Sequence, residues 1–290
     1  MQLPKSINVE PLRKLVQDRL LKPFSIDESD LGLVLSGGGA RGAYQIGVWK
    51  AMKEARVASK VKKVYGTSVG AINGAAFAQG DFDLAEQLWK DLHYSRVFDN
   101  YDGIAASAEY KPRAIYQVIV KLIKEKGFNV DPLKELLYEY LDEDKIRNSH
   151  IDFGLVVFDV STLKRKYLKK EDIPRGELID YVIASATFPL FKAHYIDGVR
   201  YLDGGLSDNR PFRFFKEDNT IKQAICIDLT TARHFYLKDG GCRDLKTNYI
   251  RASRLLGSPL AFNLQKIDRN MRLGYHDFFK QVDLHEVIRE

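Results

Sequence analysis

Four glycines near the start of the chain form a loop whose backbone amides could bind an anion. They are Gly37, Gly38, Gly39 and Gly42, and they surround Arg41. The apolar run before them, residues 31–35, is typical of a buried strand, and residues 43–52 continue at helical spacing. A loop between a strand and a helix has unpaired amides at the positive end of the helix dipole, which suits a phosphate or an oxyanion.

A second loop places a serine between two glycines at the same kind of junction. Ser68 follows a predicted strand over residues 61–65 and precedes an apolar helix over 69–79, and Gly66 and Gly70 flank it. Gly-x-Ser-x-Gly at such a turn is typical of a nucleophile elbow, in which small neighbours let a serine hydroxyl project from a tight bend. Amides in one loop and an alcohol in the next are the combination that acyl transfer needs.

The serine needs a base, and Asp203 is a candidate. Gly204 and Gly205 follow it, so its backbone can approach another loop closely. A free aspartate has a pKa of about 4 and is a poor base for a hydroxyl, but burial would raise that pKa. An ordinary hydrolase would instead place an aspartate and then a histidine after the serine. The histidines open to that alternative are His234, His276 and His285.

The glycine loop is also compatible with nucleotide binding. Gly37-x-Gly39-x-x-Gly42 matches the dinucleotide fingerprint between a strand and a helix. That fingerprint expects an acid at the end of the second strand, where residues 65–68 contain no carboxylate, and the loop lacks the lysine of a phosphate loop. A nucleotide-binding α/β protein and a noncatalytic membrane-associated protein therefore stay open as alternatives to a hydrolase.

Composition predicts an ordinary globular α/β protein. The 290 residues are 45% hydrophobic and 29% charged, and the net charge of +6 is compatible with an anionic membrane surface. Cys226 and Cys242 are too few for a disulfide framework, and no cysteine and histidine cluster has metal-ligand spacing. Residues 1–24 lack the apolar core of a signal peptide, and no apolar run reaches the length of a bilayer span. We expect a cytoplasmic protein, compatible with peripheral membrane contact, without a metal, cofactor or nucleic-acid partner.

The remaining elements are expected to build a single domain over residues 1–290 around one sheet. Residues 1–30 are expected to form an N-terminal arm, and residues 94–130 an insertion that could cap the active site. Helices are predicted over residues 82–93, from 131 and over 177–187, and strands over 152–160, 164–170 and 222–229. A hairpin with a type I′ turn at Asp197-Gly198 is predicted over 195–202, and helices are expected in the C-terminal part.

Three blocks, taken in order, resemble the signature of the patatin-like phospholipase family. They are Gly38-Gly39-Ala40-Arg41-Gly42, Gly66-Thr67-Ser68-Val69-Gly70 and Asp203-Gly204-Gly205. Residues 184–189 resemble the family's segment before the aspartate block, and Asn209 with Pro211 resemble its tail. The resemblance extends over residues 31–211, and the ordered set is far more specific than any of its members.

The resemblance implies a three-layer α/β/α sandwich with a mainly parallel central sheet. It also implies a metal-independent hydrolase of phospholipids or other acyl-ester lipids, with Ser68 as nucleophile and Asp203 as general base. The amides of Gly38 and Gly39, together with Gly37, would form the oxyanion hole. Arg41 would steady that loop or contact a phosphate. The acyl position and the head group stay open.

Overall fold

The computed structural model describes residues 23–92, 94–97, 129, 131–188, 191–192, 194–216, 218–230 and 245–284. The strands are β1 (Phe24–Ser25), β2 (Leu31–Leu35), β3 (Val61–Thr67), β4 (Asp152–Asp159), β5 (Lys164–Lys169), β6 (His194–Ile196), β7 (Val199–Asp203), β8 (Gln223–Asp228), β9 (Lys246–Arg251) and β10 (Val282–Asp283). The α-helices are α2 (Ala43–Glu54), α3 (Val69–Gln79), α4 (Phe82–Asp91), α5 (Tyr94–Val97), α8 (Asp131–Tyr140), α9 (Glu143–Asn148), α10 (Leu178–Ser185) and α11 (Leu264–Gln281). Short 3-10 helices are η1 (Gly39–Gly42), η2 (Ala58–Lys60), η3 (Gly204–Leu206) and η4 (Phe212–Phe215).

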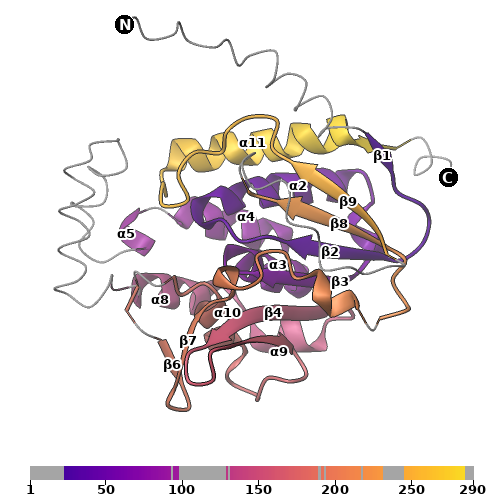
Figure 1. Cartoon of the computed structure of the whole chain (residues 1–290). Coiled ribbons are helices and arrows are strands. Elements are labelled where there is room, and N and C mark those ends of the chain that lie inside the picture. Colours follow the sequence, from indigo (N-terminus) through magenta and orange to yellow (C-terminus); the bar gives the residue numbers. More distant parts are fainter. Residues whose placement is uncertain are drawn as a thin grey trace, which may run out of the picture.

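The central sheet is mixed, with a parallel centre (Figure 1). Its strand order is β6-β7-β4-β3-β2-β8-β9, and β5 also pairs with β4. The neighbours from β4 to β9 run parallel, and helices cross over between β2 and β3 and between β3 and β4, whereas β5, β6 and β7 add antiparallel pairs at one edge. The expected α/β fold with parallel strands at its centre is therefore confirmed.

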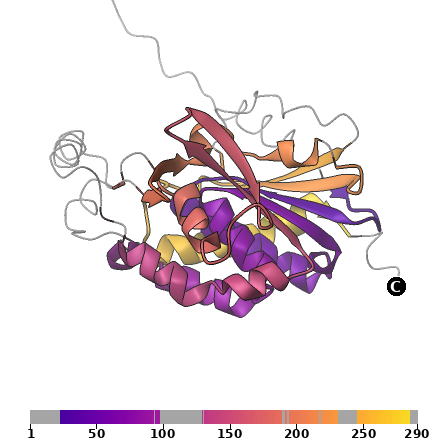
Figure 2. The same cartoon turned by 90° about the horizontal axis from the view of Figure 1, so that it is seen from below.

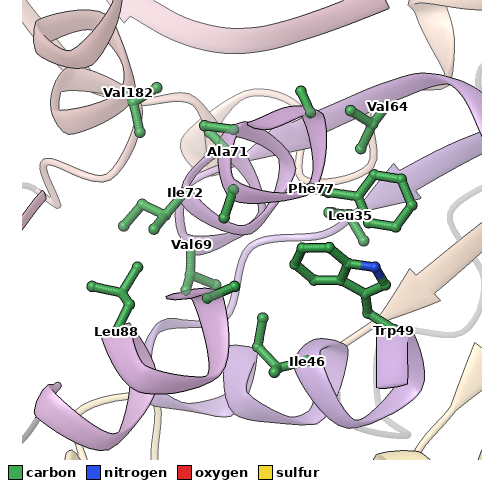
Figure 3. Packing of buried hydrophobic residues seen from close by; sticks show 14 of the residues in the cluster. Leu35, Ile46, Trp49, Val64, Val69, Ala71, Ile72, Phe77, Leu88 and Val182 are labelled. Atoms are coloured by element: carbon green, nitrogen blue, oxygen red, sulfur yellow. The ribbon is translucent and has the colours of Figure 1, made fainter. Parts of the chain in front are cut away.

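The described α-helices that pack on the sheet share one large core (Figures 2 and 3). Alternate residues of β2, β4 and β8 face it, as Leu31, Leu33 and Leu35 of β2 do. Figure 2 shows these helices gathered on one side of the sheet. Figure 3 shows side chains from several elements meeting there: Leu35, Val64, Ile46, Trp49, Val69, Ala71, Ile72, Phe77, Leu88 and Val182. This core fixes the start of α3, where Ser68 lies.

The opposite face of the sheet carries a thinner layer. Within the described residues it is covered by η4, whose Phe214 ring stacks on Tyr65 with centroids 4.2 Å apart. A Cβ at Gly32 would lie 2.6 Å from Phe215 Cζ and one at Gly154 would lie 2.9 Å from Phe214 Cε1, so these glycines let the rings lie flat on the sheet. The described structure therefore has three layers, namely the α-helices, the sheet and η4, and the layer that contains η4 is thinner than the layer of α-helices.

Several predicted elements match the structure closely. The predicted helix 69–79 is α3, and β5 folds back antiparallel on β4. The hairpin turns at Asp197 and Gly198 with φ of 48° and 75°, both positive as a type I′ turn requires. Of the helices expected in the C-terminal part, the described residues include α11, but Lys246–Arg251 forms the parallel strand β9, which was not expected.

Two expectations lie mostly outside the described residues. Residues 1–22 of the N-terminal arm and residues 98–128 and 130 of the insertion are not described. The described end of the arm forms β1, which pairs with β10, and the start of the insertion forms α5. No helix in the described ranges combines the length and apolarity needed to cross a bilayer.

Candidate active site

The register of β4 brings Ser68 and Asp203 together. Thr67, the last residue of β3, pairs with Val156, and Asp203, the last residue of β7, pairs with Val157. The consecutive β4 residues Val156 and Val157 therefore hold the ends of β3 and β7 next to each other. The Ser68 hydroxyl donates a hydrogen bond to Asp203 Oδ2 at 2.6 Å, across 135 positions of sequence.

The backbone at Ser68 has the strained geometry of a sharp strand-to-helix turn. Its φ is 58° and its ψ is −130°, a combination that side-chain-bearing residues rarely adopt. A Cβ at Gly66 would lie 2.0 Å from the carbonyl oxygen of Gly70, and one at Gly70 would lie 2.1 Å from that of Leu35. Both flanking positions therefore require glycine, as the elbow prediction expects.

Asp203 is a buried carboxylate with few partners. Asp203 is only 5% exposed, and its Oδ1 accepts a 2.7 Å hydrogen bond from the Gly205 amide. Burial raises the pKa of Asp203 to about 6, because the hydrogen bonds from Ser68 and Gly205 offset only part of the desolvation. A Cβ at Gly204 would lie 2.2 Å from the carbonyl oxygen of Val156, so glycine is required for this close approach.

No histidine of the described residues lines this site. His276 is exposed on α11, away from the cavity, and His234 and His285 lie outside the described ranges. Asp203 itself holds the position beside Ser68 that a triad would give to an imidazole. Among the candidate partners that the structure describes, Asp203 is therefore the one that contacts Ser68.

The glycine loop faces the same site, and two of its amides have no hydrogen bond within the described part of the chain. These are the amides of Gly38 and Gly39, whereas the next amide, that of Ala40, donates to the Pro259 carbonyl at 2.7 Å. The Gly37 amide donates to Asn209 Oδ1 at 3.0 Å. The expectation that Gly37 also donates to an oxyanion therefore does not agree with the structure.

Arg41 is anchored to the loops around the glycine turn. Its Nε donates to the carbonyl oxygen of Gly257 at 2.8 Å and its Nη1 to that of Leu229 at 3.5 Å. Gly39 packs against the Pro259 carbonyl oxygen, which would lie only 2.2 Å from a Cβ at this position. Its φ of 56° also favours glycine. These contacts agree with a role for Arg41 in steadying the loop. They leave its contact with a phosphate as a prediction.

A cavity of about 600 Å³ opens beside the Ser68 hydroxyl. Its polar lining is concentrated at the glycine loop, Asp203 and the segment of Asn209 and Arg210. The rest is mostly apolar and comes from separate elements: Val69, Ile72, Leu92, Val97, Leu133, Ala186, Phe188, Phe191, Leu206, Leu229, Pro259, Leu260 and Phe262. Ser68 therefore lies at the wall of a cavity whose apolar lining could accommodate a hydrocarbon chain.

The described residues offer no metal site. No group of three histidine, cysteine, aspartate or glutamate side chains among them is arranged to hold an ion.

Comparison with known proteins decides the family. The model of the family described as patatin-like phospholipase matches residues 33–216. The chain belongs to the patatin-like phospholipase family. An uncharacterised NTE family protein of Mycobacterium tuberculosis is 31% identical over 204 residues, which cover 69% of this chain and 30% of that protein. A lysophospholipase of Aspergillus terreus is 53% identical over 180 residues, covering 62% of this chain and 10% of the relative.

Other relatives extend the comparison over more of the chain. A patatin-like phospholipase domain-containing protein of Caenorhabditis elegans is 29% identical over 262 residues, covering 88% of this chain and 17% of its own length. The chain thus spans less than a third of these three relatives. The crystal structure of VipD from Legionella pneumophila matches with a TM-score of 0.53 and 15% identity, covering 90% of this chain and 69% of VipD. This likeness shows the shared patatin-like fold.

Sequence reasoning missed the cavity and the contacts that hold the patatin-like blocks in place. Asn209 and Ser185 were noted for resemblance alone, yet Asn209 binds Gly37 and Ser185 binds the Ser68 amide. The apolar lining from Leu92, Leu133 and Phe262 carries no local signal, because these residues lie far apart in sequence and meet only in the fold.

Proposed function

We propose that this chain is a serine esterase that cleaves fatty acyl esters of lysophospholipids or phospholipids. The observation that carries the proposal is the 2.6 Å hydrogen bond from Ser68 to Asp203 at the wall of an apolar cavity. Membership of the patatin-like phospholipase family supports lipid hydrolysis as the class of reaction. The name lysophospholipase, borne by fungal relatives, supports the substrate class.

The reaction begins with attack by Ser68. Asp203 takes the hydroxyl proton while Ser68 Oγ forms a bond to the ester carbonyl carbon, and the carbonyl electron pair moves onto oxygen. The amides of Gly38 and Gly39 donate to that oxyanion. In well-studied serine hydrolases the loss of one such donor raises the barrier by about 3 kcal/mol. The intermediate collapses as Asp203 returns the proton to the leaving alcohol, which leaves an acyl group on Ser68.

Water completes the cycle. Asp203, again ionised, takes a proton from a water molecule that attacks the acyl carbonyl carbon. The second tetrahedral intermediate then releases the fatty acid and returns the proton to Ser68 Oγ. A pKa of about 6 keeps Asp203 ionised at neutral pH and yet makes it a stronger base than an exposed aspartate. The Asp203 carboxyl group therefore serves as base and then as acid both in forming the acyl-enzyme and in hydrolysing it.

The cavity orients the substrate. Ile72, Leu92 and Leu133 provide the apolar wall on the helical side of Ser68, where the fatty acyl chain binds. The glycine loop and Arg41 lie at the polar part, which faces the ester and its head group. Such a substrate resides in membranes or micelles, so the enzyme works at a lipid surface, on the cytoplasmic side in our proposal.

Release of fatty acid from defined lipids tests the function. Wild type, Ser68→Ala and Asp203→Asn are incubated with lysophosphatidylcholine micelles and with phosphatidylcholine vesicles, and free fatty acid is measured. We expect release by the wild type with at least one of the two lipids and a loss of about 1,000-fold or more in both variants. Equal release by wild type and Ser68→Ala would refute the proposal.

A further inference from the structure

The last residue of α10 makes a contact that no sequence motif explained. Ser185 is fully buried, with no exposed surface, and its hydroxyl oxygen accepts the Ser68 backbone N–H at 3.0 Å. The same hydroxyl donates to the Val156 carbonyl oxygen at 2.7 Å. Ser185 thus connects the backbone of the serine elbow to β4, beside which α10 lies (Figure 1).

The amide that Ser185 binds belongs to the strained residue of the elbow. Ser68 has φ of 58° and no regular hydrogen bond for its N–H, because it lies between the end of β3 and the start of α3. A buried amide without a partner is costly, so the bond to Ser185 stabilises this backbone geometry relative to relaxed alternatives. The direction of the Ser68 hydroxyl follows from that geometry.

The residues after Ser185 hold the other member of the pair. The Asp203 amide donates to the Thr187 carbonyl oxygen at 2.8 Å, directly beyond the end of α10. Val156, the acceptor for Ser185, precedes Val157, which pairs with Asp203. The end of α10 therefore contacts the backbones of both Ser68 and Asp203 over a span of three residues.

We propose that Ser185 is a positioning residue that fixes the backbone of Ser68 so that its hydroxyl stays in line with Asp203. The proposal rests on the proposed function, because the alignment matters only if Ser68 is the nucleophile. It assigns Ser185 no contact with substrate. Its effect on catalysis passes through the 3.0 Å bond to the Ser68 amide.

Kinetics of Ser185→Ala test this role. We expect kcat to fall about 10- to 100-fold with little change in KM, the size expected for loss of one buried hydrogen bond that orients a reacting group. Labelling of Ser68 by a fluorophosphonate should slow by a similar factor. The pH at half-maximal kcat/KM should rise, because the Ser68 hydrogen bond that lowers the Asp203 pKa is weakened.

A matched control separates positioning from general destabilisation. Ser149→Ala removes a serine hydroxyl that accepts the Ile151 amide at 3.2 Å, remote from the cavity. It should keep kcat, the labelling rate and the pH profile of the wild type, all measured well below the melting temperature of each variant. A wild-type kcat and pH profile in folded Ser185→Ala would overturn the proposal.

If Ser185→Ala does not fold, a second variant tests whether Ser185 positions Ser68. Ser185→Cys preserves the volume closely but provides a weak acceptor and donor, so we expect a smaller loss of kcat in the same direction. Unchanged kcat in folded Ser185→Cys would then overturn the proposal. Failure of the wild type to release fatty acid or to react with fluorophosphonate would instead refute the proposed function.

Discussion

The Ser68 hydroxyl lies 2.6 Å from Asp203 Oδ2 because adjacent residues of β4 pair with the strands that lead to them. The alignment is therefore set by the register of β3 and β7 on β4. Buried glycines allow the two loops to meet at van der Waals distance. Ser68 and Asp203, the groups that we propose react with substrate, are thus already aligned in the structure without a ligand.

The activity should depend on pH through Asp203. Its pKa is raised to about 6 by burial, and only the ionised carboxylate can accept the Ser68 proton. We expect kcat/KM to rise with pH through about 6 and to level off above about 7. Hydrolysis of a soluble short-chain ester, measured from pH 4.5 to 8.5, checks this. A flat profile across that range would contradict the assignment of Asp203 as base.

The folding stability should fall with rising pH because of Asp203, whereas the activity should rise. The carboxyl has a pKa of about 6 in the folded protein against 3.8 as its ordinary value, so the folded state holds the proton more tightly. Stability from this group is therefore intact below about pH 4 and is lost as the pH rises through 6. Asp203→Asn removes that penalty. Its gain in unfolding free energy over wild type should be about 2 kcal/mol larger at pH 8 than at pH 4.

Chemical denaturation of both proteins at the two pH values provides this comparison. A difference between variant and wild type that is the same at pH 4 and pH 8 would mean that Asp203 ionises as readily in the folded protein as in the unfolded chain.

Asn209 should matter for the glycine loop. Its Oδ1 accepts the Gly37 amide at 3.0 Å, and its Nδ2 lies 3.4 Å from the Gly37 carbonyl oxygen. Asn209→Ala should loosen the amides that we propose bind the oxyanion and lower kcat about 10- to 100-fold, with a smaller change in KM. Asn148→Ala, at the exposed end of α9, is the control and should keep wild-type kinetics. Full activity of Asn209→Ala would show that the loop holds its shape without this contact.

The apolar wall should set the acyl chain length. Leu133 on α8 lines the cavity and is buried, so Leu133→Trp places a larger ring where we propose that the acyl chain binds. We expect kcat/KM for a palmitoyl ester to fall at least 10-fold while an acetyl ester is cleaved at the wild-type rate. Tyr138→Trp, on the exposed side of the same helix, serves as control. Equal losses for both esters would place the acyl chain elsewhere.

The fold could be read from the sequence where local patterns and tertiary structure agree. The helix 69–79 and the turn at Asp197-Gly198 follow from apolar spacing and from residues that accept positive φ. The strand β9 was missed because Lys246 and Arg251 frame it with charges. Its alternation of Thr247 and Tyr249 is too short to stand out, and pairing with β8 decides its conformation.

The candidate site was predictable in its residues and less so in its contacts. Ser68 and Asp203 were identified from motifs, and the structure brings them together. Gly37 was expected to donate to the oxyanion because it belongs to the same glycine run, but Asn209 binds its amide. Sequence cannot assign such a partner across 172 positions, since only the folded chain determines which amides remain unpaired.

Labelling with a fluorophosphonate probe, read by mass spectrometry of the digested protein, tests the central claim most directly. The account predicts one phosphonate adduct on Ser68 in the wild type, no adduct at that peptide in Ser68→Ala, and a much slower reaction in Asp203→Asn. Folded wild-type protein that gives no adduct, or an adduct on another residue that persists in Ser68→Ala, would contradict it.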